Sequence, residues 1–194
     1  PLSGSGMIII GITGTIGAGK GTVVQYLTGN RGFDHYSVRE FLLEEIRRRA
    51  MPENRDSMVE VANGLRRIHG PSYVTDQLYL RAEKRGRNCV IESIRTPGEI
   101  ESLRRKGRFI LLAVDAEPET RYRRIFARGS ETDHISFDTF VENEAREMSS
   151  PDPSSQNLRM CIRQADFLLM NNGSVEDLYR QVENVMKQLE DGRA

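Results

Sequence analysis

Short, mostly apolar runs alternate along this chain with longer stretches in which apolar residues recur every three or four positions. A short apolar run is typical of a parallel strand that is covered on both faces. Recurrence at three and four positions is typical of a helix with one buried face. The apolar runs predict five strands, at residues 7–13, 33–37, 88–92, 109–114 and 167–170.

The stretches between these runs predict helices. In residues 56–68, one face of the expected helix carries Met58, Val61, Ala62, Leu65 and Ile68. Helices are also expected at residues 22–27, 38–50, 72–85, 97–106, 118–128, 137–148 and 175–189, with a loop at residues 149–156. This order of elements predicts an α/β three-layer fold around a five-stranded parallel sheet, with right-handed crossovers.

Helix-capping residues support several of these boundaries. Thr96 and Glu99 have the spacing of a capping box, and Pro97 stands between them at the first helical position. Ser136 and Ser174 are placed to cap the helices that follow them. We therefore expect the helices after the third, fourth and fifth strands to begin at defined residues.

Composition narrows the possible partners. Lys and Arg together number 28, as do Asp and Glu, so the formal net charge is zero. A balanced chain gives no indication of binding to nucleic acid or to an anionic membrane. No apolar run reaches the ~18 residues of a membrane span. We expect small-molecule partners, no nucleic acid and no membrane; composition leaves the oligomeric state open.

Two further features concern the cellular setting. Cys89 and Cys161 lie far apart without metal-ligand spacing, so we expect buried or free thiols in a reducing compartment. Residues 1–6 lack the charged segment and apolar core of a signal peptide. We interpret them as the remnant of a tag with Met7 as the native start, and expect residues 7–190 to form one domain of a cytoplasmic protein.

The most informative segment lies between the first predicted strand and the first predicted helix. It reads Gly14, Thr15, Ile16, Gly17, Ala18, Gly19, Lys20, Gly21 and Thr22. Glycines let the backbone curl so that successive N–H groups face phosphate oxygens, and the helix N-terminus adds partial positive charge. Lys20 supplies a full charge for the β- and γ-phosphates. The segment predicts binding of a nucleoside triphosphate.

One position departs from the motif G-x-x-x-x-G-K-[ST]: Gly21 follows the lysine, which makes Thr22 the nearest hydroxyl for a metal ion. The Gly-Lys-Gly-Thr form resembles the loop of the adenylate kinase and nucleoside monophosphate kinase family, and the resemblance runs over residues 7–189. It implies a P-loop kinase fold that binds ATP and Mg2+, with acceptor-binding helices at 38–86 and a short lid at 124–146. It also implies ATP-dependent phosphoryl transfer to a nucleoside or deoxynucleoside monophosphate.

A carboxylate and an arginine follow the third predicted strand. The run Glu92-Ser93-Ile94-Arg95 resembles the Asp-Gly-Val/Ile-Arg run of archaeal proteins related to adenylate kinase. By this resemblance Glu92 organises magnesium-bound water and Arg95 holds the acceptor phosphate, because a planar guanidinium grips a phosphate with two hydrogen bonds. Glu92 and Ser93 replace the family's Asp and Gly. The alternative is a strand-end acid and a surface arginine in salt bridges.

Arginines gather in the helix predicted at 118–128. Arg121, Arg124 and Arg128 are spaced to share one face. This segment, the polar loop after it and the next helix resemble the short lid of nucleoside monophosphate kinases. By that resemblance Arg124, Arg128 and Arg146 are lid arginines that close over the phosphates and exclude water. The alternative is a solvated basic face paired with nearby glutamates.

The acceptor side carries the weakest resemblance. Ser37 and Arg39 lie where adenylate kinases have Thr-Gly-Asp-Met-Leu-Arg, but the family arginine falls on Leu42, so Arg39 is its possible substitute. Arg66 is a further acceptor candidate. Others in that region are Arg55, Arg67, His69 and Tyr73. At the end of the last predicted strand, Gly173 and Ser174 match the backbone that lines the adenine of ATP in these kinases.

Two other functions stay open at this point. The segment from Gly11 to Lys20 also resembles the loop of dephospho-coenzyme A kinases. Those enzymes phosphorylate a hydroxyl and need a carboxylate base after the second strand, whereas Asp34 precedes the end of that strand. The other alternative is a nucleotide-binding regulatory module without turnover, because Glu92 and Leu42 differ from the residues that the kinase family has at these positions.

Overall fold

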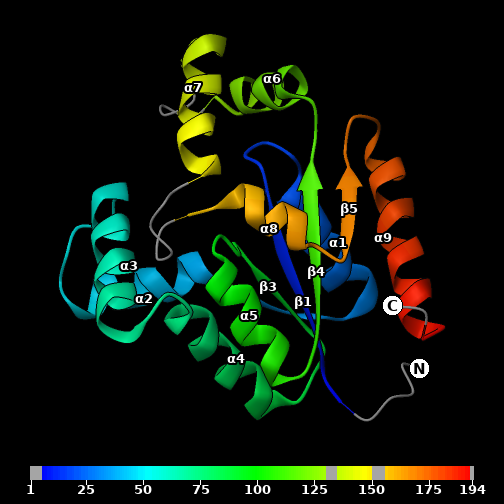
Figure 1. The fold of residues 1–194 in the computed structure, drawn as a ribbon, viewed down its shortest axis with the longest axis horizontal. Helices are drawn as coiled ribbons and strands as arrows, with labels where there is room; N and C mark the ends of the chain where they lie inside the picture. Colours follow the sequence, from blue (N-terminus) through cyan, green and yellow to red (C-terminus); the bar gives the residue numbers. More distant parts are fainter. Residues whose placement is uncertain (1–5, 130–134, 150–155, 193–194) are drawn as a thin grey trace.

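The computed structural model describes residues 6–129, 135–149 and 156–192. The strands β1 (Ile8–Gly14), β2 (Asp34–Ser37), β3 (Cys89–Glu92), β4 (Arg108–Asp115) and β5 (Phe167–Met170) form one sheet. The strand order is β2-β3-β1-β4-β5, and all neighbours are parallel (Figure 1). The predicted α/β fold with a five-stranded parallel sheet is confirmed.

Helices cover both faces of the sheet. The helices α1 (Lys20–Arg31) and α9 (Val175–Glu190) pack on one face, and α4 (Tyr73–Arg85), α5 (Pro97–Lys106) and α8 (Leu158–Gln164) pack on the other. Two further helices, α2 (Val38–Arg48) and α3 (Arg55–His69), extend this second layer. Figure 1 shows α6 (Pro118–Arg128) and α7 (Phe137–Met148) beyond the carboxyl ends of the strands.

The central strand β1 divides the core into two halves. Every residue of β1 is buried. Ile8, Ile10 and Ile12 pack toward α1 and α9, whereas Ile9 packs toward the helices of the opposite face. This alternation follows from the two-residue period of a strand. A strand that is buried on both faces holds its carboxyl end, and the loop that follows it, in a fixed place.

Capping residues begin several helices as the sequence predicts. Thr96 and Glu99 form a capping box at the start of α5, and Ser174 forms one with Asp177 at the start of α9. The hydroxyl of Ser136 accepts a hydrogen bond from the backbone N–H of Thr139 in α7. These local contacts satisfy N–H groups that have no partner within the helix.

Two elements differ from the sequence-based expectation. The helix α1 begins at Lys20 and reaches Arg31, beyond the predicted 22–27, because left-handed glycines stand at both of its caps. The helix α8 was not predicted: Asn157 caps it by accepting a hydrogen bond from the Met160 N–H. Most of the predicted loop at 149–156 lies outside the described residues.

The two cysteines are free and buried, one in β3 and one in α8. Burial raises the pKa of the Cys89 and Cys161 thiols to about 12, which makes both unreactive at neutral pH. Among the described helices, none combines the length and the apolar character that crossing a membrane would require.

The topology opens a crevice above β1. Its sheet neighbours are β3 on one side and β4 on the other, and the chain passes from β3 to β4 across it. In open α/β sheets, ligands bind outside the carboxyl ends of strands at such a switch point. The glycine-rich segment starts here, at the end of β1.

Candidate functional site

The glycines of the segment after β1 adopt conformations that other residues rarely take. The φ angles of Gly14, Gly17 and Gly19 are 138°, 76° and 106°. A Cβ added at Gly14 would lie 2.0 Å from the carbonyl oxygen of Val114, and one at Gly17 would lie 2.8 Å from that of Arg121. The backbone therefore follows a tight path that both φ and space restrict to glycine.

Side-chain donors hold the carbonyl groups of this loop one after another. The ammonium of Lys20 donates to the oxygens of Gly14 and Thr15 at 3.0 and 2.7 Å. From α6, Arg121 donates to the Ile16 oxygen at 3.3 Å, and Arg124 donates to the Gly17 and Ala18 oxygens at 3.3 and 3.4 Å. Asn171 also donates to the Ala18 oxygen, at 2.8 Å.

These contacts orient the amides that follow. A trans peptide places its N–H opposite its C=O. Since donors from α6 and from Asn171 hold the Ile16 and Ala18 oxygens, the N–H groups of Gly17 and Gly19 point to the other side. Gly19 is also the N-cap of α1, whose N-terminal dipole adds to the field of these amides. The arrangement suits the binding of phosphate oxygens.

The strand ends beside the loop are tied together. The Thr13 hydroxyl donates to the Ile94 carbonyl at 2.6 Å, and the Ile94 N–H donates to the Ile12 carbonyl at 3.1 Å. Between β3 and these contacts, Ser93 has φ 66°, in the left-handed region. The Asp-Gly-Val/Ile-Arg run that this segment resembles has glycine at this position, and glycine adopts a positive φ without strain. Ser93 adopts this left-handed conformation at the cost of local strain.

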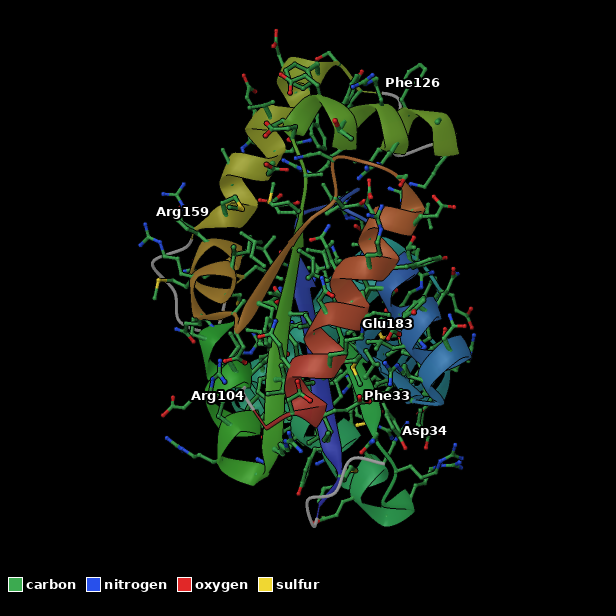
Figure 2. All side chains as sticks on the ribbon, turned by 90° about the vertical axis from the view of Figure 1, so that its right-hand side faces the viewer. Phe33, Asp34, Arg104, Phe126, Arg159 and Glu183 are labelled. Atoms are coloured by element: carbon green, nitrogen blue, oxygen red, sulfur yellow. The ribbon has the colours of Figure 1, made fainter. Side chains whose placement is uncertain are left out.

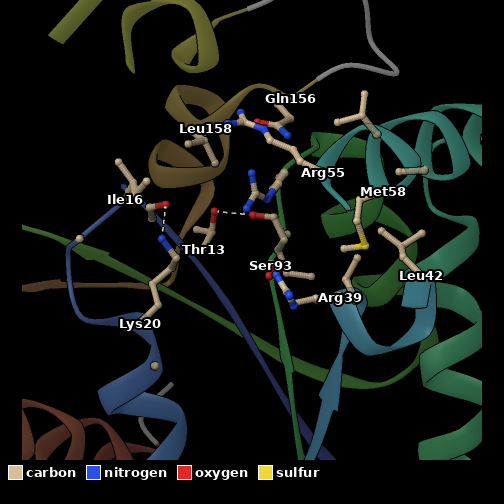
Figure 3. A pocket seen from close by; sticks show the side chains of 18 of the residues that line it. Thr13, Ile16, Lys20, Arg39, Leu42, Arg55, Met58, Ser93, Gln156 and Leu158 are labelled. Carbon is tan, nitrogen blue, oxygen red and sulfur yellow. Dashed lines mark hydrogen bonds between the residues drawn. The ribbon is translucent and has the colours of Figure 1, made fainter. Parts of the chain in front are cut away.

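A cleft with a volume of about 890 Å³ opens beside the loop (Figure 3). The segment from Thr13 to Thr22 forms one side of it, and α2 and α3 form the other. Its cationic lining residues are Lys20, Arg39, Arg55, Arg66, Arg95, Arg124 and Arg128. Its apolar wall contains Val38, Leu42, Met58, Val59, Ala62 and Leu158. Within the described part of the chain, no carboxylate lines this cleft.

Many of the described acids form ion pairs outside the cleft. Most described ion pairs join arginines outside the cleft to glutamate or aspartate, as in Arg81–Glu44 at 2.8 Å and Arg104–Asp166 at 3.2 Å. None of the described ion pairs involves any of the six cleft arginines. A chain of zero net charge thus concentrates positive charge where phosphates would bind.

The backbone of Arg95 is held from two sides. A buried carboxylate, Glu99, is 2% exposed and accepts hydrogen bonds from the N–H groups of Arg95 and Thr96 at 3.1 and 3.0 Å. Burial raises the pKa of this carboxyl above its usual range. On the other side, the Asn157 N–H donates to the Arg95 carbonyl at 2.8 Å. The half-buried Arg95 side chain therefore enters the cleft from a fixed origin.

Glu92 lies at the carboxyl end of β3 but does not line the cleft. Its carboxylate is 3.3 Å from His35 Nε2 on the neighbouring strand. The hydrogen bond from His35, together with Ser37 and the charge of Lys20, holds the pKa of Glu92 below its usual value. Glu92 is therefore ionised at neutral pH and is close enough to Lys20 to interact with it.

The predicted lid arginines occupy two different places. Arg124 and Arg128 line the cleft, whereas Arg146 lies exposed on α7 and is not among the cleft residues. Burial lowers the pKa of the Arg124 guanidinium, which remains charged. Arg121, expected on the same face, is instead buried against the loop and Glu144.

Other candidates also lie outside the cleft. Ser37 caps α2 by accepting the Glu40 N–H, and Gly173 is exposed after β5. His69 stacks on Tyr73, with ring centroids 4.2 Å apart. Arg39, Arg55 and Arg66 do line the cleft. Sequence reasoning missed several lining residues, among them Asn63, Ser93, Gln156 and Leu158. The helical period of α3 would have placed Asn63 near Arg66.

The sheet order, the glycine loop after the central strand and the cationic cleft define a protein with a P-loop kinase-like fold. The chain belongs to the family whose model is described as an AAA domain, which matches residues 10–149.

The chain also matches relatives of similar length. A UPF0200 protein of Staphylothermus marinus is 26% identical over 183 residues, with 94% of this chain and 93% of the relative covered. A UPF0200 protein of Methanocaldococcus jannaschii is 27% identical, with 94% and 91% covered. The match therefore spans nearly the whole of each chain.

Solved structures share the fold. A crystal structure of a Thermus thermophilus protein aligns with a TM-score of 0.61 and 26% identity, covering 95% of this chain and 99% of that one. The shikimate kinase of Bacteroides thetaiotaomicron aligns with a TM-score of 0.59 and 16% identity over 95% and 99%. The dephospho-CoA kinase of Campylobacter jejuni aligns with a TM-score of 0.55 and 15% identity over 97% and 100%. At 16% and 15% identity, the similarity to these two kinases shows a shared fold.

Two glycine substitutions test the geometry of the loop. Gly14→Ala should lower the free energy of unfolding by about 2 kcal/mol or more, because its Cβ meets the Val114 carbonyl and its φ is 138°. Gly21→Ala, in the first turn of α1, meets no atom within 4 Å and should raise it by up to about 1 kcal/mol. Urea denaturation measures both. Equal stability of the two variants would contradict the described loop path.

Proposed function

We propose that this chain is an ATP-dependent phosphotransferase that phosphorylates a nucleoside or deoxynucleoside monophosphate to the diphosphate. One observation carries the choice of acceptor: the cleft beside the loop is lined by arginines and, among its described lining residues, by no carboxylate. A hydroxyl acceptor needs a base to remove its proton. A phosphate acceptor is already ionised and needs charge neutralisation and alignment instead.

The residues present fit a triphosphate at the loop. The amides of Gly17 and Gly19 and the N-terminus of α1 would bind phosphate oxygens, and Lys20 would place its charge beside them. Lys20 already reaches the loop carbonyls, so it needs only a small change to meet a phosphate. Gly173, two residues after Asn171, is our proposed backbone contact for the adenine.

The donor set also fits Mg2+. Thr22 lines the cleft in the first turn of α1, and the ionised Glu92 lies at the adjacent strand end. Hydroxyl and carboxylate oxygens are ligands that Mg2+ accepts, directly or through water. A bound magnesium ion neutralises charge on the phosphates. Thr22 and Glu92 would hold it, while His35 keeps the Glu92 carboxylate in place.

The opposite side of the cleft suits an anionic acceptor with a flat, apolar base. Arg95 would bind the acceptor phosphate, with Arg39 and Arg66 next to it. The apolar side chains of Leu42 and Met58 offer contact to the base. Arg124 and Arg128 would add charge where the phosphoryl group moves, since preorganised donors at that place lower the barrier. Leu42, which stands where the kinase family has arginine, would therefore contact the base in the same cleft.

The dephospho-coenzyme A alternative receives less support from the structure. Asp34, the acid considered for that base, stands at the start of β2 and pairs with Arg85 at 2.8 Å. Figure 2 shows Asp34 at the opposite end of the molecule from Phe126 of α6. The amino end of a strand cannot present a base to a cleft at the carboxyl ends.

The test is an acceptor panel. The protein is incubated with ATP, magnesium and, separately, AMP, CMP, GMP, UMP, their deoxy forms and dephospho-coenzyme A. The phosphorylated acceptor is then quantified, as a nucleoside diphosphate or as coenzyme A. We expect turnover with one or more monophosphates. Turnover with dephospho-coenzyme A alone would establish the alternative. ATP binding without transfer to any acceptor would favour the regulatory module.

Lys20→Met should abolish transfer and leave the fold intact. Loss of its charge at the moving phosphoryl group should cost at least ~3 kcal/mol in the transition state, which is over about 100-fold in kcat. The control is Lys187→Met, an exposed lysine of α9. Steady-state kinetics and circular dichroism of both variants check this. Turnover of Lys20→Met at the wild-type rate would refute the site.

Arg95→Ala should raise the KM of the acceptor and leave the KM of ATP nearly unchanged. Loss of a charge-assisted contact should cost roughly 2–4 kcal/mol, or at least ~30-fold in acceptor KM. Arg105→Ala is the matched control, because Arg105 is exposed on α5 and pairs with Glu101. Asp34→Asn should keep activity. Loss of activity in Asp34→Asn with unchanged acceptor KM in Arg95→Ala would favour the hydroxyl acceptor.

Glu92→Gln should raise the magnesium concentration needed for half-maximal rate while leaving ATP affinity without magnesium unchanged. The carboxylate is ionised and lies beside Lys20, so its charge contributes to the proposed metal site. Magnesium titrations of turnover measure the shift, with Glu101→Gln on exposed α5 surface as control. An unchanged titration would assign Glu92 to its contact with His35 alone.

A further inference from the structure

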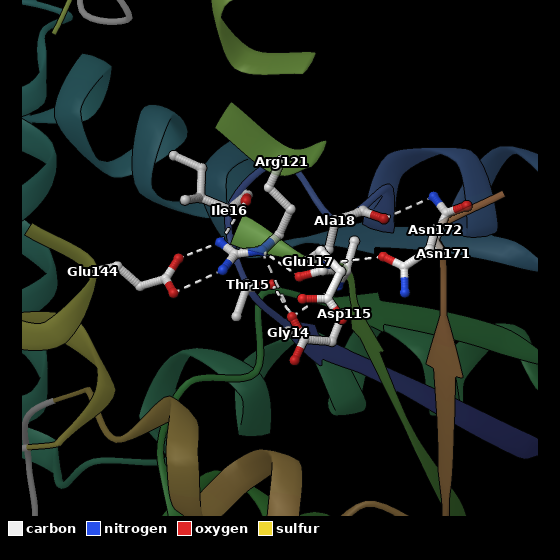
Figure 4. Close-up of polar contacts among 12 residues, drawn as sticks. Gly14, Thr15, Ile16, Ala18, Asp115, Glu117, Arg121, Glu144, Asn171 and Asn172 are labelled. Atoms are coloured by element: carbon white, nitrogen blue, oxygen red, sulfur yellow. Dashed lines mark hydrogen bonds and ion pairs between the residues drawn. The ribbon is translucent and has the colours of Figure 1, made fainter. Parts of the chain in front are cut away.

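A buried arginine connects three parts of the molecule at the base of the loop. Arg121 lies on α6 and is 2% exposed. Its Nε donates to the Ala116 carbonyl at 2.8 Å, and one terminal nitrogen donates to the Ile16 carbonyl at 3.3 Å. Both terminal nitrogens bind the carboxylate of Glu144 on α7, one of them at 2.8 Å (Figure 4).

The charge of Arg121 needs this partner. A buried guanidinium that loses a hydrogen-bonded carboxylate is strongly destabilising. The other nearby acid, Asp115, is 3.7 Å away and already accepts the Thr15 hydroxyl at 2.7 Å and the Ala116 N–H at 2.9 Å. Glu144 is therefore the acid that, together with the Ala116 carbonyl, fixes the guanidinium beside the Ile16 carbonyl.

The two helices also pack against each other through aromatic rings. Tyr122 of α6 contacts Phe137 and Phe140 of α7, with ring centroids 5.5 and 5.6 Å apart. The guanidinium carbon of Arg121 lies 5.5 Å from the Phe140 ring centroid. No described residue of α7 lines the cleft. These contacts connect α7 to the loop that follows β1.

We propose that Glu144 is a positioning residue for ATP and acts through Arg121. By fixing the guanidinium, it holds the Ile16 carbonyl and thus aims the following N–H, that of Gly17, at the phosphates. This makes α7 part of the nucleotide site although it does not touch the cleft. The inference rests on the proposed function only in taking ATP as the ligand of the loop.

The test measures ATP binding rather than turnover. Glu144→Gln removes the charge and keeps the shape of the side chain. We expect the Kd of ATP, measured by isothermal titration calorimetry, to rise about fivefold or more, and the KM of the acceptor to stay unchanged. Glu142→Gln is the matched control, because Glu142 is exposed on the same helix. It should bind ATP like the wild type.

Two further variants separate positioning from stability. In an Arg121→Gln background, Glu144→Gln should have no further effect on the Kd of ATP, because the acting group is gone. Glu144→Asp keeps the charge and serves as the second variant if Glu144→Gln does not fold. Its Kd for ATP should lie between those of the wild type and Glu144→Gln. Thermal melts confirm that each variant is folded at the assay temperature.

The outcomes distinguish the inference from the proposed function. A lower Tm in Glu144→Gln or Glu144→Asp with wild-type Kd for ATP would make Glu144 merely structural and overturn the inference. If Glu144→Gln raised the Kd of ATP as much in the Arg121→Gln background as in the wild type, the proposal that Glu144 acts through Arg121 would be overturned. Absence of ATP binding by the wild-type protein would instead refute the proposed function.

Discussion

The orientation of the peptide groups between Gly14 and Ala18 is the constraint on which the candidate site depends. A loop can present amides to phosphates only if its carbonyls face other donors, and buried carbonyls require such donors in any case. Here Lys20, Arg121, Arg124 and Asn171 supply them. These donors come from α1, α6 and the end of β5, so distant segments of the chain converge on one short loop.

Because of this constraint, the arginines of α6 have different roles. Arg121 and Arg124 hold loop carbonyls, Arg124 also faces the cleft, and Arg128 lines the cleft from the last turn of the helix. An arginine near phosphates thus has two possible duties, to shape the binding loop or to contact the ligand. Spacing along a helix places both kinds on similar faces, and only the surrounding carbonyls and carboxylates distinguish them.

The parts of the fold that were predictable from sequence depend on local or strongly periodic patterns. Apolar strands, the capping box at Thr96 and the glycine loop are of this kind. The seven-residue α8 is too short for a clear period. The burial of Arg121 depends on Glu144, 23 residues further along the chain. The side of the cleft opposite the loop combines side chains from α2, α3 and the start of α8, which no single motif contains.

The charge distribution connects these points to function. Glutamates outside the cleft pair with arginines of the same surface. Glu45, for example, binds Arg48 and also Arg49, the latter at 2.8 Å, and these contacts lower the pKa of Glu45 to about 2. The cleft arginines have no such described carboxylate partners, so the positive charge of the cleft is not offset by nearby acids. A cleft with this charge is suited to a ligand that carries several negative charges. In the proposed function, the phosphates of the two nucleotide substrates would supply those charges.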